Sequence, residues 1–394
     1  MNSAEKGFLT LIKSAVVQQA FPLPEDFSLE EAYCLISSHH IWTLAFEGAM
    51  LCGISRKDPV MEKLFMRYCK SLQISEGQMY EVGRLFAAFE ENAIDYLPFK
   101  GCVLKSCYPR PELRAMGDAD ILIRREQYPR VKELLTEHGF RWESDKPCNA
   151  TWNTDMLSAE IHWRLFNDDH EKYRLITGHF GNGWKNAVRQ EGHRYAMTPE
   201  DTYLYLFVHF TKHYRHSGIG CRQAADLWLY KRLHPELDEM LLRKNLEKIK
   251  LLSFYENIQA LLAYWFEEGT ADERVEYISR YILSNGSWGS MKNVVLTGAA
   301  QHMHPGEGGK KAKLRFYFRH LFPGCKDLEK KYPILRRFPW LLPAVWIVRM
   351  FDKLFVTKDA REKLEHFQSV LQDDQIEQRY RELQYVGLSK EWEQ

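Results

Sequence analysis

The sequence lacks three features that would place it in a specialised class: paired cysteines, an excess of one charge and a long hydrophobic run. Its eight cysteines are dispersed and include no CxxC pair, which fits reduced thiols in a cytoplasm better than a disulfide framework or a zinc ribbon. With 54 basic and 53 acidic side chains, no overall field favours nucleic acid or an anionic membrane, so any such contact has to be local. We therefore expect a cytoplasmic globular protein.

The longest apolar stretch, residues 338–351, contains two prolines and Arg349. It falls short of the roughly 20 apolar residues that a membrane-spanning helix needs, so the sequence predicts no transmembrane segment. Its basic flanks leave two interpretations open, contact with a membrane surface or a partner and burial in its own domain, of which we favour burial. Glu5, Lys6 and Lys13 interrupt the N-terminal apolar pattern, and we expect a helix of the mature protein there rather than a secretion signal.

Enough apolar material is present for two or three domains. Of 394 residues, 45% are hydrophobic and 13% aromatic, as well-packed cores require. Residues 1–93 show apolar side chains at helical spacings of three and four, residues 94–195 contain four short β-rich runs, and residues 196–394 return to helical patterns. The predicted fold class is α+β, with a small central core flanked by a helical N-terminal region and a helical C-terminal domain.

Local signals mark where helices begin and end. Residues 126–138 form one strong helical pattern that Gly139 closes, because glycine accepts the left-handed conformation that ends many helices. Thr198 and Pro199 precede two acids, which is typical of a helix start with threonine as its cap. The remaining motifs therefore lie on strands and turns between these helices.

Two aspartates, Asp118 and Asp120, open the apolar run Ile-Leu-Ile. In a strand, residues two apart project from the same face with α-carbons roughly 6.6 Å apart, so both carboxylates can converge on one cation or bridge two. Carboxylate pairs favour hard ions such as magnesium, and a third acid usually completes a two-metal site. Such a pair alone is more often a solvated turn.

Glu160 is the candidate for the third acid. It lies in the β-rich segment Ser-Ala-Glu-Ile-His-Trp-Arg, among apolar and aromatic neighbours. By strand parity, Glu160 and His162 share one face. If this strand lies beside the strand of Asp120, three carboxylates meet.

Upstream, Lys100 and Gly101 end one β-rich run and precede a segment with helical spacing. A glycine at such a turn lets backbone amides approach phosphates, and the helix start adds a partial positive charge. Lys100 offers a point charge to a triphosphate, and Arg114 offers a fork for one of its oxygens. Each signal alone is weak, but the ordered set of turn, arginine, paired aspartates and later acid is far more specific.

This ordered set resembles the nucleotidyltransferase fold of the DNA polymerase β superfamily, and more closely an uncharacterised bacterial nucleotidyltransferase family. The motifs that carry the resemblance are Phe-Lys-Gly at 99–101, Arg114, Asp-Ala-Asp-Ile-Leu-Ile at 118–123, Glu-Ile-His-Trp at 160–163 and Thr-Pro-Glu-Asp at 198–201. The similarity covers roughly residues 30–350, and its most specific part is 97–163. It implies a polymerase β-like core, a small mixed sheet with helices.

The resemblance also implies an activity. A nucleoside monophosphate would pass from an NTP, with ATP favoured, to a hydroxyl acceptor such as a small molecule, an RNA end or a protein, with release of pyrophosphate. Asp118 and Asp120 would bind two magnesium ions, or manganese, and Glu160 would bind the ion that activates the acceptor. Lys100 and Gly101, with Arg114, would hold the triphosphate.

One position departs from the superfamily pattern, which usually has Gly-Ser at the turn. Here Cys102 follows Gly101, and no hydroxyl is present to contact a phosphate. A catalytically weakened nucleotide-binding or regulatory module of the same fold is therefore the alternative function. The presence of three acids favours the enzyme, because a binding module does not need the third.

Several histidines and one aspartate are candidates for a substrate cleft. His209 and His213 lie four residues apart on one helical face, which is compatible with cleft contacts, structural roles or, least favoured, zinc. His162 could orient Glu160 or pack in its strand. Asp226 lies four residues after Arg222, and the simplest interpretation is an ion pair within one helix, with a cleft role as the minority view.

Residues 310–319 alternate basic and aromatic side chains. This pattern suits RNA or a lipid headgroup surface. The favoured interpretation is a solvated helix whose aromatic side chains point inward.

Overall fold

The computed structural model describes most of the chain, namely residues 1–166, 174–329, 331–354 and 370–388. The chain forms two compact units. The first comprises Met1–Tyr214, Ile219–Trp288 and Gly387–Gln394, and the second Arg215–Gly218 and Gly289–Val386. Each unit has a hydrophobic core of its own. The predicted boundaries near residues 93 and 195 stay predictions.

The first unit begins with four helices. They are α1 (Ser3–Val17), α2 (Leu29–His39), α3 (Trp42–Leu51) and α4 (Pro59–Glu91). Three of them start at a side chain that accepts a hydrogen bond from a first-turn backbone N–H, namely Asn2, Ser28 and Asp58, which satisfies a donor that has no partner inside the helix. In α1, Phe8 and Leu11 lie on the buried face, as the helical spacing predicts.

A mixed five-stranded sheet follows. Its strands are β1 (Tyr96–Phe99), β2 (Ala119–Ile123), β3 (Arg141–Asp145), β4 (Asn149–Asn153) and β5 (Ser158–His162). Their order is β1-β2-β5-β4-β3, with β2 and β5 parallel and the other neighbours antiparallel. The short helices that connect them are α5 (Gly101–Leu104), η1 (Lys105–Cys107), η2 (Pro111–Leu113), η3 (Arg125–Gln127) and α6 (Tyr128–Glu137). The predicted α+β class and small mixed sheet are confirmed.

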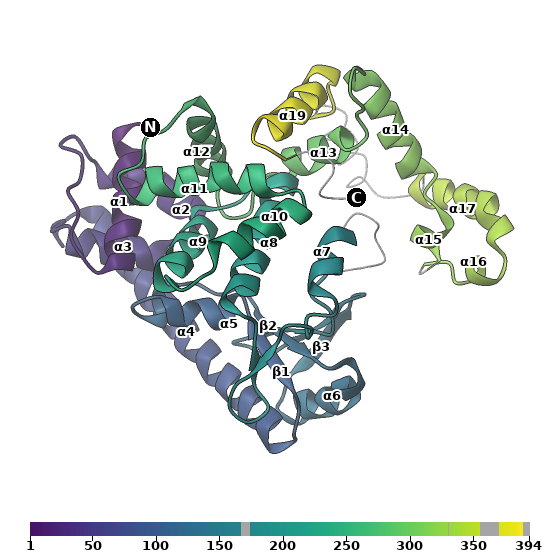
Figure 1. Cartoon of the computed structure of the whole chain (residues 1–394), viewed down its shortest axis with the longest axis horizontal. Coiled ribbons are helices and arrows are strands. Elements are labelled where there is room, and N and C mark those ends of the chain that lie inside the picture. The colour runs from purple at the N-terminus through teal and green to yellow at the C-terminus, as the bar shows by residue number, and fades with distance from the viewer. Residues whose placement is uncertain (167–173, 330, 355–369, 389–394) are drawn as a thin grey trace. The chain divides into compact units, whose positions relative to one another are not determined.

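The two faces of the sheet differ because successive side chains of a strand point to opposite sides. On one face, alternate residues of β2 and β5 join α4 and α6 in the core, namely Ala119, Ile121, Ile123, Ala159 and Ile161. Figure 1 shows α4 and α6 beside the sheet. The register pairs Ile121 with Ile161 and Asp120 with Glu160, so both acids lie on the other face.

The rest of the first unit is largely helical. Its elements are α7 (Arg174–Phe180), β6 (Val188–Arg189), β7 (Tyr195–Ala196), α8 (Pro199–His216, whose last two residues belong to the second unit), α9 (Cys221–Leu233), α10 (Glu239–Lys248), α11 (Leu252–Phe266) and α12 (Glu273–Asn285). Thr198 caps α8, as predicted, since its hydroxyl accepts the Asp201 N–H at 3.2 Å. Tyr205 of α8 contacts Phe99 of β1 edge-on at 5.3 Å between ring centroids. α8 therefore borders the face of the sheet opposite α4.

The second unit is helical throughout its described residues. Its elements are α13 (Met291–Ala300), α14 (Gly309–Leu321), α15 (Cys325–Leu328), α16 (Ile334–Arg337), η5 (Pro339–Leu341), α17 (Leu342–Leu354) and α19 (Asp373–Tyr385). Helices α13, α14 and α19 share one core. A smaller cluster of Leu328, Leu335 and Val345 joins α15, α16 and α17.

We expected residues 338–351 to be buried in their own domain, and this prediction is wrong for the side of the segment that faces solvent. Val345 is buried, whereas Trp340, Ile347 and Val348 are exposed. The cluster that α17 packs against is small, and a helix on such a cluster buries only one side.

Residues 310–319 lie on α14, where the expectation for the aromatic side chains holds only in part. Phe316 is buried, but Phe318 is exposed, as is Leu314. Among the helices that the structure describes, none has both the length and the apolar character that crossing a membrane requires.

Candidate functional site

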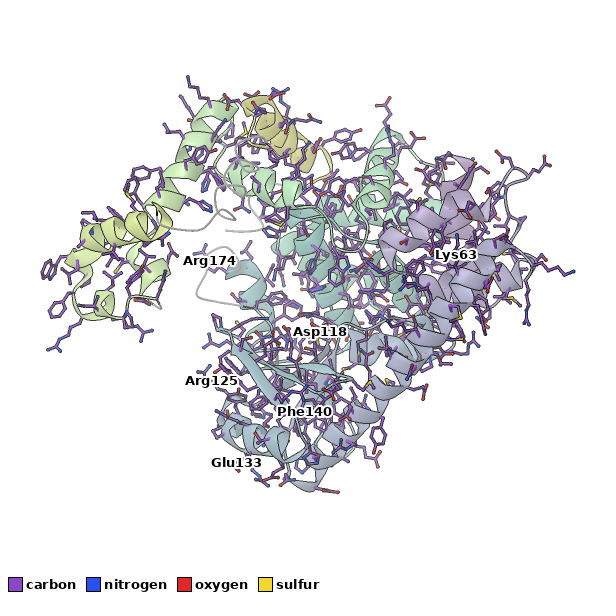
Figure 2. The ribbon with its side chains drawn as sticks, turned by 180° about the vertical axis from the view of Figure 1, so that it is seen from behind. Lys63, Asp118, Arg125, Glu133, Phe140 and Arg174 are labelled. Atoms are coloured by element: carbon purple, nitrogen blue, oxygen red, sulfur yellow. The ribbon has the colours of Figure 1, made fainter. Side chains whose placement is uncertain are left out.

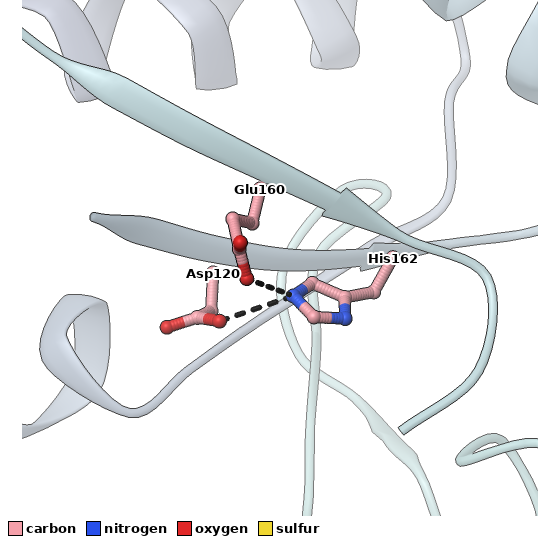
Figure 3. A group of neighbouring side chains, drawn as sticks. All are labelled: Asp120, Glu160 and His162. Atoms are coloured by element: carbon pink, nitrogen blue, oxygen red, sulfur yellow. Dashed lines mark hydrogen bonds and ion pairs between the residues drawn. The ribbon is translucent and has the colours of Figure 1, made fainter. Parts of the chain in front are cut away.

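Strand register brings one acid from β2 and one from β5 together. Asp120 and Glu160 are direct neighbours in the parallel pairing, and His162 lies opposite Leu122. Potential ligand atoms of Asp120, Glu160 and His162 all lie within 4.8 Å of one another (Figure 3). Within the described part of the chain, no other set of three His, Cys, Asp or Glu side chains is close enough to share a metal ion.

The imidazole of His162 lies between the two acids. Its Nε2 is 3.0 Å from Asp120 Oδ1 and 3.4 Å from Glu160 Oε2. Both neighbours are carboxylates, so Nε2 carries a proton and donates it. Burial opposes the charged imidazolium, but the hydrogen bonds to Asp120 and Glu160 outweigh burial and raise the pKa of His162.

Each acid also has a lysine partner. Lys100 Nζ lies 2.6 Å from Asp120 Oδ1, and Lys146 Nζ lies 2.9 Å from Glu160 Oε1. The hydrogen bond from His162 and the ion pair with Lys146 hold the pKa of Glu160 below its usual value. Burial alone would raise the pKa of Asp120, but the charge of Lys100 and the hydrogen bond from His162 lower it. Both carboxylates are therefore ionised.

Asp118 lies immediately before β2, on the opposite side of the sheet from Glu133 of α6 (Figure 2). Burial and the charge of Asp120 raise the pKa of Asp118, and the charge of Glu160 adds to this. The three acids are thus close enough to repel one another. Only Asp120 and Glu160, however, belong to the compact group with His162.

The turn from β1 into α5 is tightly packed. Lys100 has a φ of 48°, a left-handed conformation that is uncommon outside glycine. A Cβ on Gly101 would stand 2.7 Å from Met116 Cγ and 3.2 Å from Arg114 Nη1, so the position favours glycine. The Cys102 thiol packs against the hydrophobic core, and burial raises its pKa to about 12. The turn therefore offers a neutral thiol in place of a hydroxyl.

Arg114 is held by a buried carboxylate. Its Nε and Nη2 each lie 2.9 Å from an oxygen of Asp226. The expected ion pair between Arg222 and Asp226 is wrong, because Asp226 faces Arg114 and Arg222 donates instead to the carbonyl oxygen of Ala115 at 2.8 Å. Asp226 thus fixes a guanidinium whose Nη1 remains next to Gly101.

Helix α8 borders the site through Tyr205 and His209. The two rings are stacked, with centroids 6.3 Å apart, and His209 contacts His213 edge-on at 4.5 Å. Burial, and then the positive charge of Lys100, lower the pKa of His209, so this imidazole is neutral. A cleft role for His209 and His213 stays a prediction.

Two contributors to the site carry no sequence signal. Lys146 lies between β3 and β4, and it reaches Glu160 only because β4 and β5 are neighbours. Tyr205 has the helical apolar spacing of an ordinary core residue. Neither residue type nor local spacing distinguishes these side chains from many others.

A cavity of about 620 Å³ opens at the first turn of α8. Lys185, Lys248 and Asn245 contribute to its wall. Asp201 also lines it, but its carboxylate accepts a hydrogen bond from His179 at 2.9 Å. Glu200 lines it too, and its carboxylate accepts the Asp238 N–H at 3.0 Å. Two lysines and two acids thus share the wall with the amide of Asn245, which makes the cavity suitable for a polar group.

A family model described as an uncharacterised nucleotidyltransferase matches residues 25–267, more than half of the chain. The chain belongs to this family. The matched segment contains the entire five-stranded sheet and the group of Asp120, Glu160 and His162. A search of curated proteins and a search of solved structures gave no match.

Membership in this nucleotidyltransferase family confirms the resemblance that the motifs predict. It supports nucleotidyl transfer as the general activity and implies an NTP as substrate. Asp120 and His162, both buried, and the half-buried Glu160 add a group of side chains that could hold a metal ion.

Proposed function

We propose that this nucleotidyltransferase uses a divalent metal to move a nucleoside monophosphate from an NTP, with ATP favoured, to an acceptor hydroxyl. The bond between the α- and β-phosphates breaks, a bond from the acceptor oxygen to the α-phosphorus forms, and pyrophosphate leaves with the acceptor proton passing to solvent. The observation that carries the proposal is the pairing of Asp120 with Glu160 on adjacent parallel strands, beside His162. A small molecule, an RNA end or a protein can supply the hydroxyl.

The donor set fits a hard divalent ion. Asp120 Oδ2 is buried, and no donor among the described side chains and backbone groups hydrogen-bonds to it, so its lone pairs are available. Two carboxylates with one imidazole nearby suit magnesium or manganese. In the proposal, Asp118, Asp120 and Glu160 hold two such ions, and His162 orients the carboxylates through its Nε2–H. Bound ions would neutralise the triphosphate and make the acceptor hydroxyl more acidic.

We assign the triphosphate to Lys100, Arg114 and the backbone N–H of Gly101. Lys100 now pairs with Asp120, and its ammonium becomes available to a phosphate oxygen once Asp120 is neutralised by metal. Arg114 does not have to leave its carboxylate partner to contact a phosphate. Asp226 binds Nε and Nη2, and Nη1, which lies beside Gly101, is the nitrogen that we assign to the phosphate.

We assign the acceptor to the cavity at the first turn of α8. The same helix reaches the metal-binding face through Tyr205, which contacts Phe99 next to Lys100. The cavity's two lysines, its two acids and the Asn245 amide favour a polar acceptor that forms several hydrogen bonds.

The deciding experiment is label transfer from each α-labelled NTP, with magnesium or manganese and a cell extract as the source of acceptors. Wild type is compared with Asp118→Ala/Asp120→Ala and with Asp155→Ala, which removes an exposed carboxylate on the surface. We expect transfer by wild type and Asp155→Ala and none by the double variant. Equal transfer by all three proteins would disprove the enzyme hypothesis.

The packing of Cys102 against the core favours the second candidate function, a catalytically weakened nucleotide-binding module. Such a module would bind NTP and manganese without transferring label. Equilibrium dialysis with labelled ATP separates the two candidates, because binding without transfer in every extract would support the module.

A further inference from the structure

Helices α14 and α17 of the second unit expose large apolar side chains. On α14, Leu314 is 70% exposed and Phe318 is 60% exposed; Trp340 of η5 is 73% exposed and Ile347 of α17 is 56% exposed. Val348 continues the outer face of α17. Single exposed apolar side chains are ordinary on protein surfaces. A helix whose solvent-facing side is mainly apolar is unusual.

The exposed groups of the two helices belong to one packed region. The Phe318 ring lies 5.0 Å from the Phe322 ring, and the Phe322 ring lies 5.1 Å from the Trp346 ring of α17. The Trp346 indole N–H also donates to the carbonyl oxygen of Pro323 at 2.9 Å. We call the exposed side chains of residues 309–350 the α14–α17 surface.

Charge is concentrated in the same segment. Residues 309–350 contain eleven Lys and Arg against Asp327 and Glu329, a net charge of +9, in a chain whose total is +1. The other residues therefore carry a net charge of −8. Such asymmetry gives one segment a strong positive field although the chain is nearly neutral.

Part of this charge is neutralised within the unit, but much of it faces solvent. Arg315 pairs with Glu307, and Lys313 lies 3.7 Å from Asp373. Arg336 and Arg337, by contrast, are exposed next to the exposed Trp340. Exposed cationic and apolar side chains thus lie close together in the sequence between the end of α16 and the start of α17.

We infer that the α14–α17 surface binds the face of an anionic lipid bilayer. Apolar side chains enter the headgroup region while Lys and Arg pair with lipid phosphates, which is how amphipathic helices lie on membranes. RNA would use the basic and aromatic groups but not aliphatic ones such as Leu314 and Ile347, because bases stack on planar rings. Charge complementarity combined with aliphatic exposure therefore favours a bilayer.

The test is flotation of the full chain with vesicles of phosphatidylcholine, alone or mixed with phosphatidylglycerol, at low and high salt, with tRNA binding measured in parallel. We expect binding to the mixed vesicles at low salt, weaker binding at high salt and little binding to phosphatidylcholine alone. Absence of binding to the mixed vesicles, or tRNA binding in its place, would overturn the inference.

Two variants identify the surface that binds. Trp340→Ser/Ile347→Ser is expected to lower the vesicle partition coefficient by at least about tenfold through lost apolar transfer. Arg336→Glu/Arg337→Glu is expected to lower it by at least about tenfold through lost attraction to lipid phosphates.

Matched controls lie in the first unit. Trp288→Ser removes a tryptophan that is 80% exposed, and Arg56→Glu/Lys57→Glu reverses two adjacent exposed charges. The controls should bind as wild type does. Binding by the Trp340→Ser/Ile347→Ser variant at wild-type strength, with circular dichroism showing all proteins folded, would contradict the inference.

Discussion

Asp120 is a side chain that is paired on one oxygen and open on the other. Oδ1 accepts from Lys100 and His162, while Oδ2 is buried without a hydrogen-bond donor among the described groups. A buried carboxylate oxygen without a hydrogen-bond donor is unfavourable, and a bound cation would remove this cost. At the scale of one residue, this imbalance is the strongest sign of a cation.

Asp120→Asn should weaken metal binding. The amide keeps the shape but removes the charge and one acceptor, so we expect manganese affinity to fall by at least about tenfold, since a lost charged ligand contributes more than 1.4 kcal/mol. Titration with manganese followed by electron paramagnetic resonance measures the change. Asp155→Asn serves as the control, and equal affinity in both variants would show that Asp120 is not a ligand.

His39 should make the fold sensitive to acid. Burial lowers the pKa of His39 from 6.5 to about 4 and outweighs the Leu283 carbonyl opposite Nε2, which raises it. The neutral ring accepts the Cys221 N–H at Nδ1. A neutral native ring contributes stability that is complete above pH 6.5 and is lost as pH falls toward 4. The loss is roughly 3 kcal/mol in the free energy of unfolding.

Urea unfolding between these pH values measures that loss. In His39→Gln, the free energy of unfolding should depend less on pH. In His304→Gln, at an exposed position, its pH dependence should match wild type. A dependence in His39→Gln as steep as in wild type would place the acid sensitivity elsewhere.

Single residues were predictable where local rules decide them. Strand parity correctly places Glu160 and His162 on one face, and Thr198 caps its helix as its neighbours indicate. The partner of Arg114 was not predictable, because Asp226 lies 112 residues away in the sequence. From its charge alone, the whole Arg114 guanidinium is predicted to be free for a phosphate. In the folded chain, two of its three nitrogens donate to Asp226.

At the scale of elements, the β1–α5 turn depends on a glycine without a side chain. Gly101→Ala would press a methyl group against Met116, so we expect a loss of about 1 to 3 kcal/mol in the free energy of unfolding. Gly83→Ala in α4 has open space around the new Cβ and should be neutral or stabilise by up to about 1 kcal/mol. Urea unfolding of both variants measures this contrast, and equal effects would refute the packing argument.

The connection between the turn region and α9 depends on a buried ion pair. The Arg114 and Asp226 side chains are 8% and 5% exposed, so Asp226→Asn leaves an unpaired buried charge and should lower the free energy of unfolding by about 3 to 5 kcal/mol. The Arg141–Asp155 pair is 67% and 85% exposed, and Asp155→Asn should cost at most about 1 kcal/mol. Chemical denaturation compares them, and similar losses would mean that burial does not set the strength of the Arg114 pair.

The elements themselves were predictable to different degrees. Four strands and the helix ended by Gly139 follow from periodicity and turn residues. Strand β4, Asn149–Asn153, does not, because its sequence begins and ends with asparagine, which is depleted in strands. The strand order could not be predicted from local sequence patterns either, because β5 inserts between β2 and β4. That order pairs Asp120 with Glu160.

At the scale of the whole molecule, the two units have separate cores, and the candidate metal group of Asp120, Glu160 and His162 lies in the first. Bound metal stabilises only the structure that forms its site, by about 2.7 kcal/mol at a concentration of about 100 times the Kd. Manganese should therefore slow amide hydrogen exchange in β2 and β5 and leave α13 and α14 unchanged. Mass spectrometry of the intact chain measures this, and equal protection of all four elements would show that the units unfold together.

The alternation of β2 also affects how the protein can evolve. Ala119 and Ile121 maintain the core, while Asp120 between them faces the other side. Replacing Asp120 therefore removes a proposed metal ligand but no side chain of the core, whereas replacing Ala119 or Ile121 changes the core and leaves the carboxylate. Under the proposed function, a lineage can therefore lose nucleotidyl transfer at this position and keep the core of the sheet, so that the fold outlasts the activity.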